Sequence, residues 1–231
     1  MNERQNILAR VREGLTMPAP FPGEHELHGN EHAPHPAPIT AGSVTKWLPP
    51  VGIGFGDQVA LFTFNSAELR TDFQIFNSES DMLAALGEVA KNEDWQRIGS
   101  HRGKLTDAAA ASLGLPIVLT DAAYSAPELE NCSVGISECD FLIAQTGSVL
   151  VTTRSSGGRA LSVLPPHHVV LARREQLLPD LPAGFAALKK KYSGDFPSFM
   201  SLITGPSRTG DIERILVLGA HGPKKLTVFC V

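Results

Sequence analysis

The chain has 231 residues, of which 42% are hydrophobic and 19% are charged. This length accommodates one well-buried domain with an appendage, because single cores stop growing at about 250–300 residues, and a net charge of −4 gives no basic surface for nucleic acid. No stretch approaches the roughly 18 consecutive apolar residues of a membrane span, and the N-terminus lacks the apolar core of a secretory signal, so we expect a cytoplasmic protein that does not bind membranes.

The first predicted element is an amphipathic helix within residues 1–16. Ile7, Leu8, Val11 and Leu15 recur at helical spacing. Such a helix either folds back onto its own core or docks on a neighbouring protein. Residues 17–50 then hold eight of the 17 prolines and half of the eight histidines, a composition typical of an extended tether. We therefore predict that the folded domain occupies residues 51–231.

Four histidines in this tether raise the question of a metal site: His25, His28, His32 and His35. Four imidazoles within eleven residues satisfy the ligand count of zinc or nickel. However, Gly29, Pro34 and Pro36 break any helix that would align them. We therefore interpret the segment as solvated and of low complexity, and we predict no metal in this chain.

From about residue 58, short apolar runs alternate with helical patterns. Predicted helices begin after the capping residue Ser78, span residues 106–113 before Gly114, and span residues 181–191. The predicted strands are residues 72–76, 97–99, 116–119, 141–144, 149–151, 169–172, 200–203, 215–218 and 226–231. This alternation predicts an α/β fold with a mainly parallel sheet that is covered on both faces.

Residues 204–213, TGPSRTGDIE, have the pattern of a loop that binds an anion and then opens a helix near Thr209. Gly205 permits close approach of the backbone to a ligand, Ser207 and Thr209 provide hydroxyls, and Arg208 provides a guanidinium. A helix N-terminus here favours phosphate, carboxylate or sulfate. The alternative is an ordinary capped helix whose own acidic residues satisfy its dipole.

Two further segments follow predicted strands. Thr146, Gly147 and Ser148 come after the strand that ends at residue 144, and Arg154 and Arg159 flank the sequence RSSGGR after the next strand. Ligands of open parallel sheets bind at the carboxyl ends of the strands, so we predict that these residues join the 204–209 loop in one anion site. The alternatives are an ordinary hairpin turn and an ordinary flexible loop.

Three histidines lie near these segments. His167 and His168 lead into the strand at residues 169–172, and alternation places one of them toward solvent and the other toward the core. A general base needs an orienting carboxylate, for which Asp140 is the candidate, and a structural role is the alternative. His221 lies between two glycines in GAHGP and is a further candidate for the cleft.

The cysteines argue against an electron-transfer centre in this chain. Cys132 and Cys139 are separated by six residues, which matches neither zinc nor iron–sulfur spacings, and Cys230 is far from both. We therefore expect no cofactor bound by this chain itself.

Two blocks of sequence carry a resemblance to a known family. TGPSRTGDIE followed by VLGAHGP at residues 217–223 resembles the C-terminal signature of the LUD-domain family, the lactate-utilisation protein C proteins of bacteria. Residues 139–166, CDFLIAQTGSVLVTTRSSGGRALSVLPP, resemble its central block. The resemblance covers residues 59–231. It departs from the family pattern at Gln145, where an acidic residue is usual, so any role that needs a carboxylate at this position is not supported.

The resemblance implies a three-layer α/β/α fold of the sugar-phosphate isomerase and CoA-transferase type (NagB/RpiA/CoA-transferase-like), which formyltetrahydrofolate cyclo-ligases share. It also implies a subunit that acts with iron–sulfur partner proteins in oxidising L-lactate to pyruvate and binds a small anion or a partner. One alternative is a free-standing enzyme of this superfamily acting on a phosphorylated or CoA-bearing substrate, for which fold analogy is weak support. Another is a non-catalytic docking protein.

Overall fold

The computed structural model describes residues 3–16, 48, 50–209, 217–218 and 222–231. The chain divides into two units, residues 1–46 and 47–231. Within the first unit, helix α1 (Glu3–Thr16) forms where the apolar spacing predicts it, and its Ile7 and Leu8 are exposed. The four tether histidines and His221 lie outside the described residues. No described helix is long and apolar enough to cross a membrane.

The centre of the second unit is a six-stranded sheet in which all neighbouring strands are parallel, in the order β1-β12-β7-β4-β2-β3. Its strands are β1 (Asp72–Ile75), β2 (Ile98–Ser100), β3 (Ile117–Leu119), β4 (Val134–Glu138), β7 (His167–Ala172) and β12 (Lys225–Cys230). The predicted parallel sheet is therefore confirmed. The strand predicted at residues 116–119 forms at Ile117–Leu119, where it is an edge strand with Ile117 exposed.

A second, mainly antiparallel sheet has the order β8-β5-β6-β9. It contains β5 (Phe141–Ile143), β6 (Ser148–Thr152), β8 (Leu177–Leu178) and β9 (Met200–Ile203). A separate two-stranded ribbon pairs β10 (Arg208–Thr209) with β11 (Val217–Leu218). Thr209, near which a helix was expected to begin, is thus paired in a strand, and residues 210–216, which that helix would occupy, lie outside the described residues.

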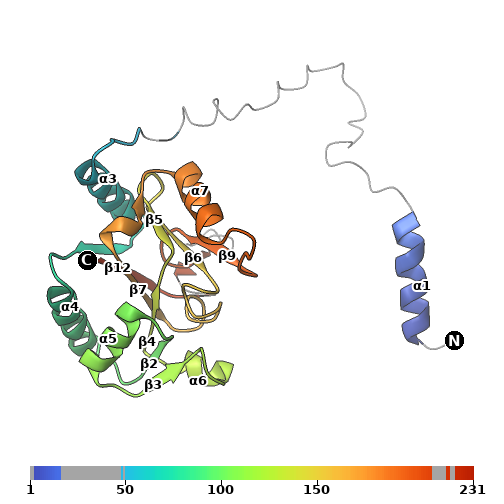
Figure 1. Ribbon diagram of the computed structural model, residues 1–231. Helices are drawn as coiled ribbons and strands as arrows, with labels where there is room; N and C mark the ends of the chain where they lie inside the picture. The colour runs from blue at the N-terminus through green and yellow to red at the C-terminus, as the bar shows by residue number, and fades with distance from the viewer. Residues whose placement is uncertain (1–2, 17–47, 49, 210–216, 219–221) are drawn as a thin grey trace. The chain divides into compact units, whose positions relative to one another are not determined.

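The sheets and helices form three layers (Figure 1). Helices α4 (Glu79–Asn92) and α5 (Lys104–Leu113) cover one face of the parallel sheet, and Met82 and Leu105 pack there against Ile136. The other face packs against the second sheet and α3 (Phe55–Glu68), with Phe62 and Val170 in the shared core. Helix α7 (Leu181–Lys191) covers the outer side of the second sheet.

Local sequence explains where these helices begin and end. The Ser78 hydroxyl accepts a hydrogen bond from the Asp81 N–H at the start of α4, and Gly114 ends α5 in the left-handed conformation, as predicted. The short helix α6 (Ala126–Glu130) has a capping box, and a single 3-10 turn spans Arg174–Gln176. Neither α3 nor the central strand β4 was predicted, because polar residues interrupt the apolar pattern of both segments.

One side chain of α3 fastens the β5–β6 turn to this helix. The Asn65 amide donates to the carbonyl oxygens of Ala144 at 2.9 Å and Gln145 at 3.0 Å. Replacing Asn65 by Ala removes both of these hydrogen bonds, so we expect the free energy of unfolding in urea to fall by about 1–3 kcal/mol. The Thr63→Ala variant, on the exposed side of α3, should change it by less than about 0.5 kcal/mol. Equal effects of both substitutions would contradict this anchoring role.

Candidate functional site

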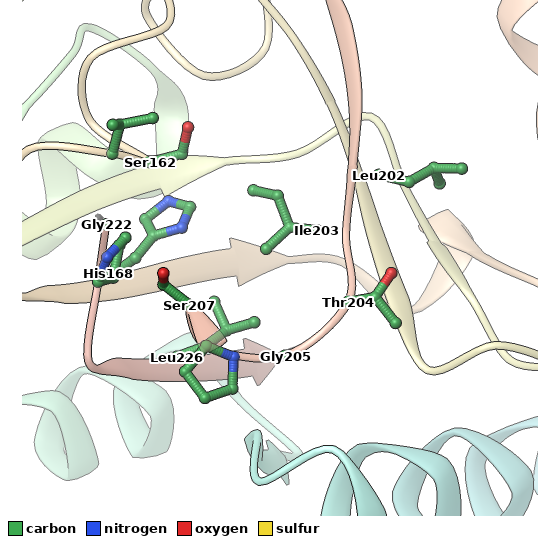
Figure 2. Close-up of a pocket in the computed structure, with 12 residues that line it drawn as sticks. Ser162, His168, Leu202, Ile203, Thr204, Gly205, Ser207, Gly222 and Leu226 are labelled. Atoms are coloured by element: carbon green, nitrogen blue, oxygen red, sulfur yellow. The ribbon is translucent and has the colours of Figure 1, made fainter. Parts of the chain in front are cut away.

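A cavity of about 270 Å³ lies between the parallel sheet, the second sheet and three loop segments. It is lined by residues 162–163, 202–207 and 222–223 together with His168 and Leu226 (Figure 2). This volume is below the range of about 300–1,000 Å³ that is usual for drug-sized ligands. The site therefore suits a small molecule.

The cavity wall is mostly apolar, with Val163, Ile203 and Leu226 among its side chains. The hydroxyl groups of Ser162, Thr204 and Ser207 and the imidazole of His168 are its polar side-chain groups. Among the described lining residues there is no charged side chain. A ligand buried in this space must therefore be largely uncharged where it contacts the wall, because burying an unpaired charge is costly.

Two of the loop segments at the cavity are fastened to each other. The N–H of Ser207 donates to the carbonyl oxygen of Pro223 at 2.9 Å. Gly205 has a φ of 86°, and a Cβ at this position would lie 2.7 Å from the carbonyl oxygen of Leu69, so only glycine fits here. The segments TGPS and GP, which are distant in sequence, thus form one continuous wall.

His168 is the most buried polar residue of the wall, with 1% of its surface exposed. It lies on the face of β7 that packs toward the second sheet, and its Nε2 is 2.8 Å from the hydroxyl of Ser137 on β4. Its Nδ1 has no partner among the described residues. Burial and the neighbouring His167 lower the pKa of His168 to about 3, so the ring is neutral at pH 7.

The predicted TGS segment lies next to this wall but does not line the cavity. Gly147 closes the hairpin turn between β5 and β6 with a φ of 62°, which agrees with the alternative of an ordinary turn. The Ser148 hydroxyl is 2.8 Å from that of Thr204, which links the turn to the 204–207 loop. The Thr146 hydroxyl is buried without a partner among the described residues.

Arg208 lies behind the wall. Its guanidinium donates to the carbonyl oxygen of Leu69 at the end of α3 and lies 3.5 Å from the point where a Cβ of Gly205 would be. Arg208 is exposed, and it neighbours the cavity without being part of its lining. Thr209 follows in β10, and its side chain lies outside the described residues. Anion binding by this pair stays a prediction.

Arg154 and Arg159 do not join these residues. Strand β6 runs antiparallel to β5 and β9, so the loop after β6 leaves the second sheet at the end opposite the TGS turn. Arg154 pairs with Asp195 at 2.6 Å, and Arg159 lies over the ring of Phe199 and donates to the Ser198 carbonyl. The prediction of a single anion site is therefore wrong in its grouping.

The carboxyl edge of the parallel sheet, where we expected the ligand, is filled by the protein itself at β2 and β4. Glu138 accepts a hydrogen bond from the Leu105 N–H at 2.8 Å and so caps α5. Gly157 packs directly on His101, because a Cβ on this glycine would lie 2.2 Å from that of the histidine. The cavity instead lies near the amino ends of β7 and β12, where His168 and Leu226 are neighbours.

Asp140 is not the orienting carboxylate for either histidine. It is buried, and one of its oxygens is 2.7 Å from both the Lys191 ammonium and the Tyr192 hydroxyl. The expectation that one histidine faces solvent is also wrong, since His167 is only 3% exposed and lies on the opposite face of β7 from His168. Both faces of β7 are covered, so its alternate side chains enter two different hydrophobic cores.

The sequence interpretation missed Ser162 and Ser137. Ser162 lies within the block ALSVLPP, whose family resemblance was its only signal. Ser137 had no signal because strand β4 itself was not predicted.

The fold is that of an α/β protein with a central parallel sheet and a second, mainly antiparallel sheet packed against it. The LUD domain family matches residues 77–231, and the chain belongs to this family. A protein of Anoxybacillus flavithermus named lactate utilization protein C is 32% identical over 174 residues, which cover 72% of this chain and 71% of that relative. A protein of the same name from Geobacillus kaustophilus is 34% identical over 104 residues, 44% of this chain.

The match to the Geobacillus relative spans only 43% of that protein's length. Among solved structures, the crystal structure of a DUF162 family protein from Deinococcus radiodurans matches with a TM-score of 0.59 and 19% identity, covering 78% of this chain and 99% of that one. This likeness confirms the fold.

Near the amino end of β7, Glu93 contacts both His167 and Lys225. These contacts predict how the stability of the protein depends on pH. Burial raises the pKa of Glu93, but hydrogen bonds from Lys225, His167 and Trp95 outweigh burial and hold the pKa at about 2. Its stabilising contribution is therefore complete above about pH 4.5 and is lost as the pH falls toward 2. We expect Glu93→Gln to lower the free energy of unfolding by on the order of 1–3 kcal/mol at pH 7, and this difference to shrink below pH 4.5.

Urea unfolding of both proteins between pH 7 and pH 2.5 measures this difference. The control is Glu88→Gln, which removes the same charge from an exposed ion pair with Lys91. A difference between wild type and Glu93→Gln that stays constant over this range would contradict the assignment.

Proposed function

We propose that this chain is a component of a bacterial lactate-utilisation system and that its cavity binds a small organic anion. The role in lactate utilisation is supported by the names of relatives at 32–34% identity. One structural observation carries the proposal further. The TGPS segment and the GP segment at residues 222–223, which both belong to the C-terminal family signature, lie on one wall with His168 of the central block.

The cavity has the chemistry for a small carboxylate with an apolar part. Its aliphatic side chains accommodate a short carbon chain, and its hydroxyls provide hydrogen bonds. Arg208 lies directly behind Gly205 and uses one of its donors for the Leu69 carbonyl, so its positive charge acts on the rim of the site. A carboxylate at the rim and an uncharged remainder within the cavity would satisfy both features.

We place electron transfer in iron–sulfur partner proteins rather than in this chain. The three cysteines are buried, and burial raises the pKa of the Cys139 thiol and raises that of Cys230 to about 11. Metal ligation needs a thiolate, so these raised pKa values favour a structural role for both residues. In this proposal, the chain supplies a binding function and its partners supply the redox centres.

Growth on L-lactate tests the proposed role. Deleting the gene from its host should abolish growth on L-lactate as the sole carbon source and leave growth on glucose unchanged, and the wild-type gene should restore it. Normal growth of the deletion strain on L-lactate would contradict the role and would favour an unrelated small-molecule enzyme.

The contribution of Arg208 has a matched control in Arg159. Both side chains are guanidinium groups on the second unit, but Arg159 lies at the far end of the second sheet. We expect Arg208→Ala to weaken binding of pyruvate or L-lactate at least about tenfold in titration calorimetry, because a hydrogen bond to a charged group contributes about 1.5–3 kcal/mol. The Arg159→Ala variant should bind as wild type does. Equal affinities of all three proteins would remove Arg208 from the site.

A further inference from the structure

Strand β9 lies at the edge of the second sheet, where it pairs with β6 on one side only (Figure 1). In an antiparallel strand, the backbone groups of alternate residues point to opposite sides. The backbone groups of Phe199 and Ser201 point toward β6, since the Phe199 carbonyl accepts a hydrogen bond from the Thr153 N–H at 3.2 Å. The N–H and C=O groups of Met200 and Leu202 therefore point outward, and no described strand pairs with them.

A hydrogen bond just before β9 agrees with this alternation. Ser198 belongs to the same alternate set as Met200 and Leu202, and its carbonyl oxygen accepts from the Arg159 guanidinium at 3.4 Å rather than from β6. Among the described residues, no partner takes up the outward backbone groups of Met200 and Leu202. Unpaired backbone groups along an exposed sheet edge form a template for pairing with another strand.

The side chains of β9 do not protect this edge. Natural sheets shield their edges with charged residues, with proline in the edge strand or with a covering segment. Residues 196–207, FPSFMSLITGPS, contain no charged residue, and β9 itself contains no proline. Met200 is 45% exposed and Leu202 is 38% exposed, and Val163, which lines the same cavity as Leu202, is 51% exposed. An apolar and uncharged edge of this kind is typical of an interaction surface.

A two-fold axis through Ser201 satisfies the whole edge. An antiparallel copy of β9 in this register places Met200 opposite Leu202 of the second copy, and Leu202 opposite its Met200. The two residues of each such pair exchange both of their backbone hydrogen bonds, so every outward group of the two strands gains a partner. The same register stacks the Met200 and Leu202 side chains as two apolar cross-strand pairs. Because residues 196–207 carry no charge, the two strands oppose no like charges.

We propose that β9 pairs antiparallel with β9 of a second copy of this chain, about a two-fold axis at Ser201, and so joins the two second sheets into one continuous sheet. A second copy is favoured over a strand of another protein, because the register that satisfies one edge satisfies the other by symmetry. The pairing uses the edge of β9, whereas the ligand of the proposed function occupies the cavity that residues 202–207 line. The proposal therefore does not depend on lactate binding.

Analytical ultracentrifugation of the full chain over a wide range of protein concentration measures the association. We expect a reversible dimer, because the paired segment is short. Leu202→Lys should weaken dimerisation at least about tenfold, since it places a charge on the edge and removes an apolar cross-strand contact. Phe64→Lys is the matched control and should dimerise as wild type does, because Phe64 is 65% exposed on α3 and takes no part in this pairing.

Two results of this experiment would overturn the proposal. One is a wild-type chain that stays monomeric at every concentration, which would leave the β9 edge to a different protein. The other is a dimer that Leu202→Lys leaves intact, which would place the contact between copies on another surface. Thermal unfolding of both variants confirms that each of them is folded.

Two cysteine variants test the register. The two Ser201 residues would form a non-hydrogen-bonded pair with Cα atoms about 4.5 Å apart, which is within the range of a disulfide. Ser201→Cys should therefore give a disulfide-linked dimer under a mild oxidant. Ser198→Cys should not, because its two copies would lie roughly 20 Å apart in this register. The native cysteines Cys132, Cys139 and Cys230 are buried, so the wild-type chain should give little linked dimer. Absence of the link in Ser201→Cys, or equal linking of both variants, would contradict the proposal.

Discussion

The arrangement of the second unit depends on the burial of both faces of strand β7. His167 and His168 are consecutive on this strand, so their side chains point into two different cores. A buried imidazole needs hydrogen bonds, and the structure supplies them from different elements: Glu93 and Thr227 for His167, and Ser137 for His168. The hydrogen bonds of His167 and His168 therefore accompany the packing of helices on one face of β7 and of the second sheet on the other.

The second sheet determines which loops meet. Because β6 runs antiparallel to both of its neighbours, the ends of β5 and β9 lie together with the start of β6, and the Ser148 and Thr204 hydroxyls meet there. The same geometry carries Arg154 and Arg159 to the other end. The cavity forms on the side of the family signature loops, and its described wall is built from aliphatic side chains, backbone turns, hydroxyls and one neutral histidine rather than from a cluster of cations.

Much of the fold was predictable from local patterns, and most of the site was not. Alternating strands and helices predicted the parallel sheet, and Ser78 and Gly114 set helix ends because capping is a local property. Strand direction in the second sheet is set by pairing between distant segments, which a short apolar run such as 149–151 does not encode. The partners of Asp140 lie about fifty residues away on α7 and beyond, so no spacing rule finds them.

The central claim is that a small carboxylate occupies this cavity, and a crystal structure of the full chain grown with L-lactate tests it most directly. The claim predicts density for the ligand in the space lined by residues 202–207 and 222–223, with its carboxylate toward Arg208. A ligand bound beside Arg154 and Arg159 at the other end of the second sheet, or a cavity filled only by water at saturating L-lactate, would contradict it.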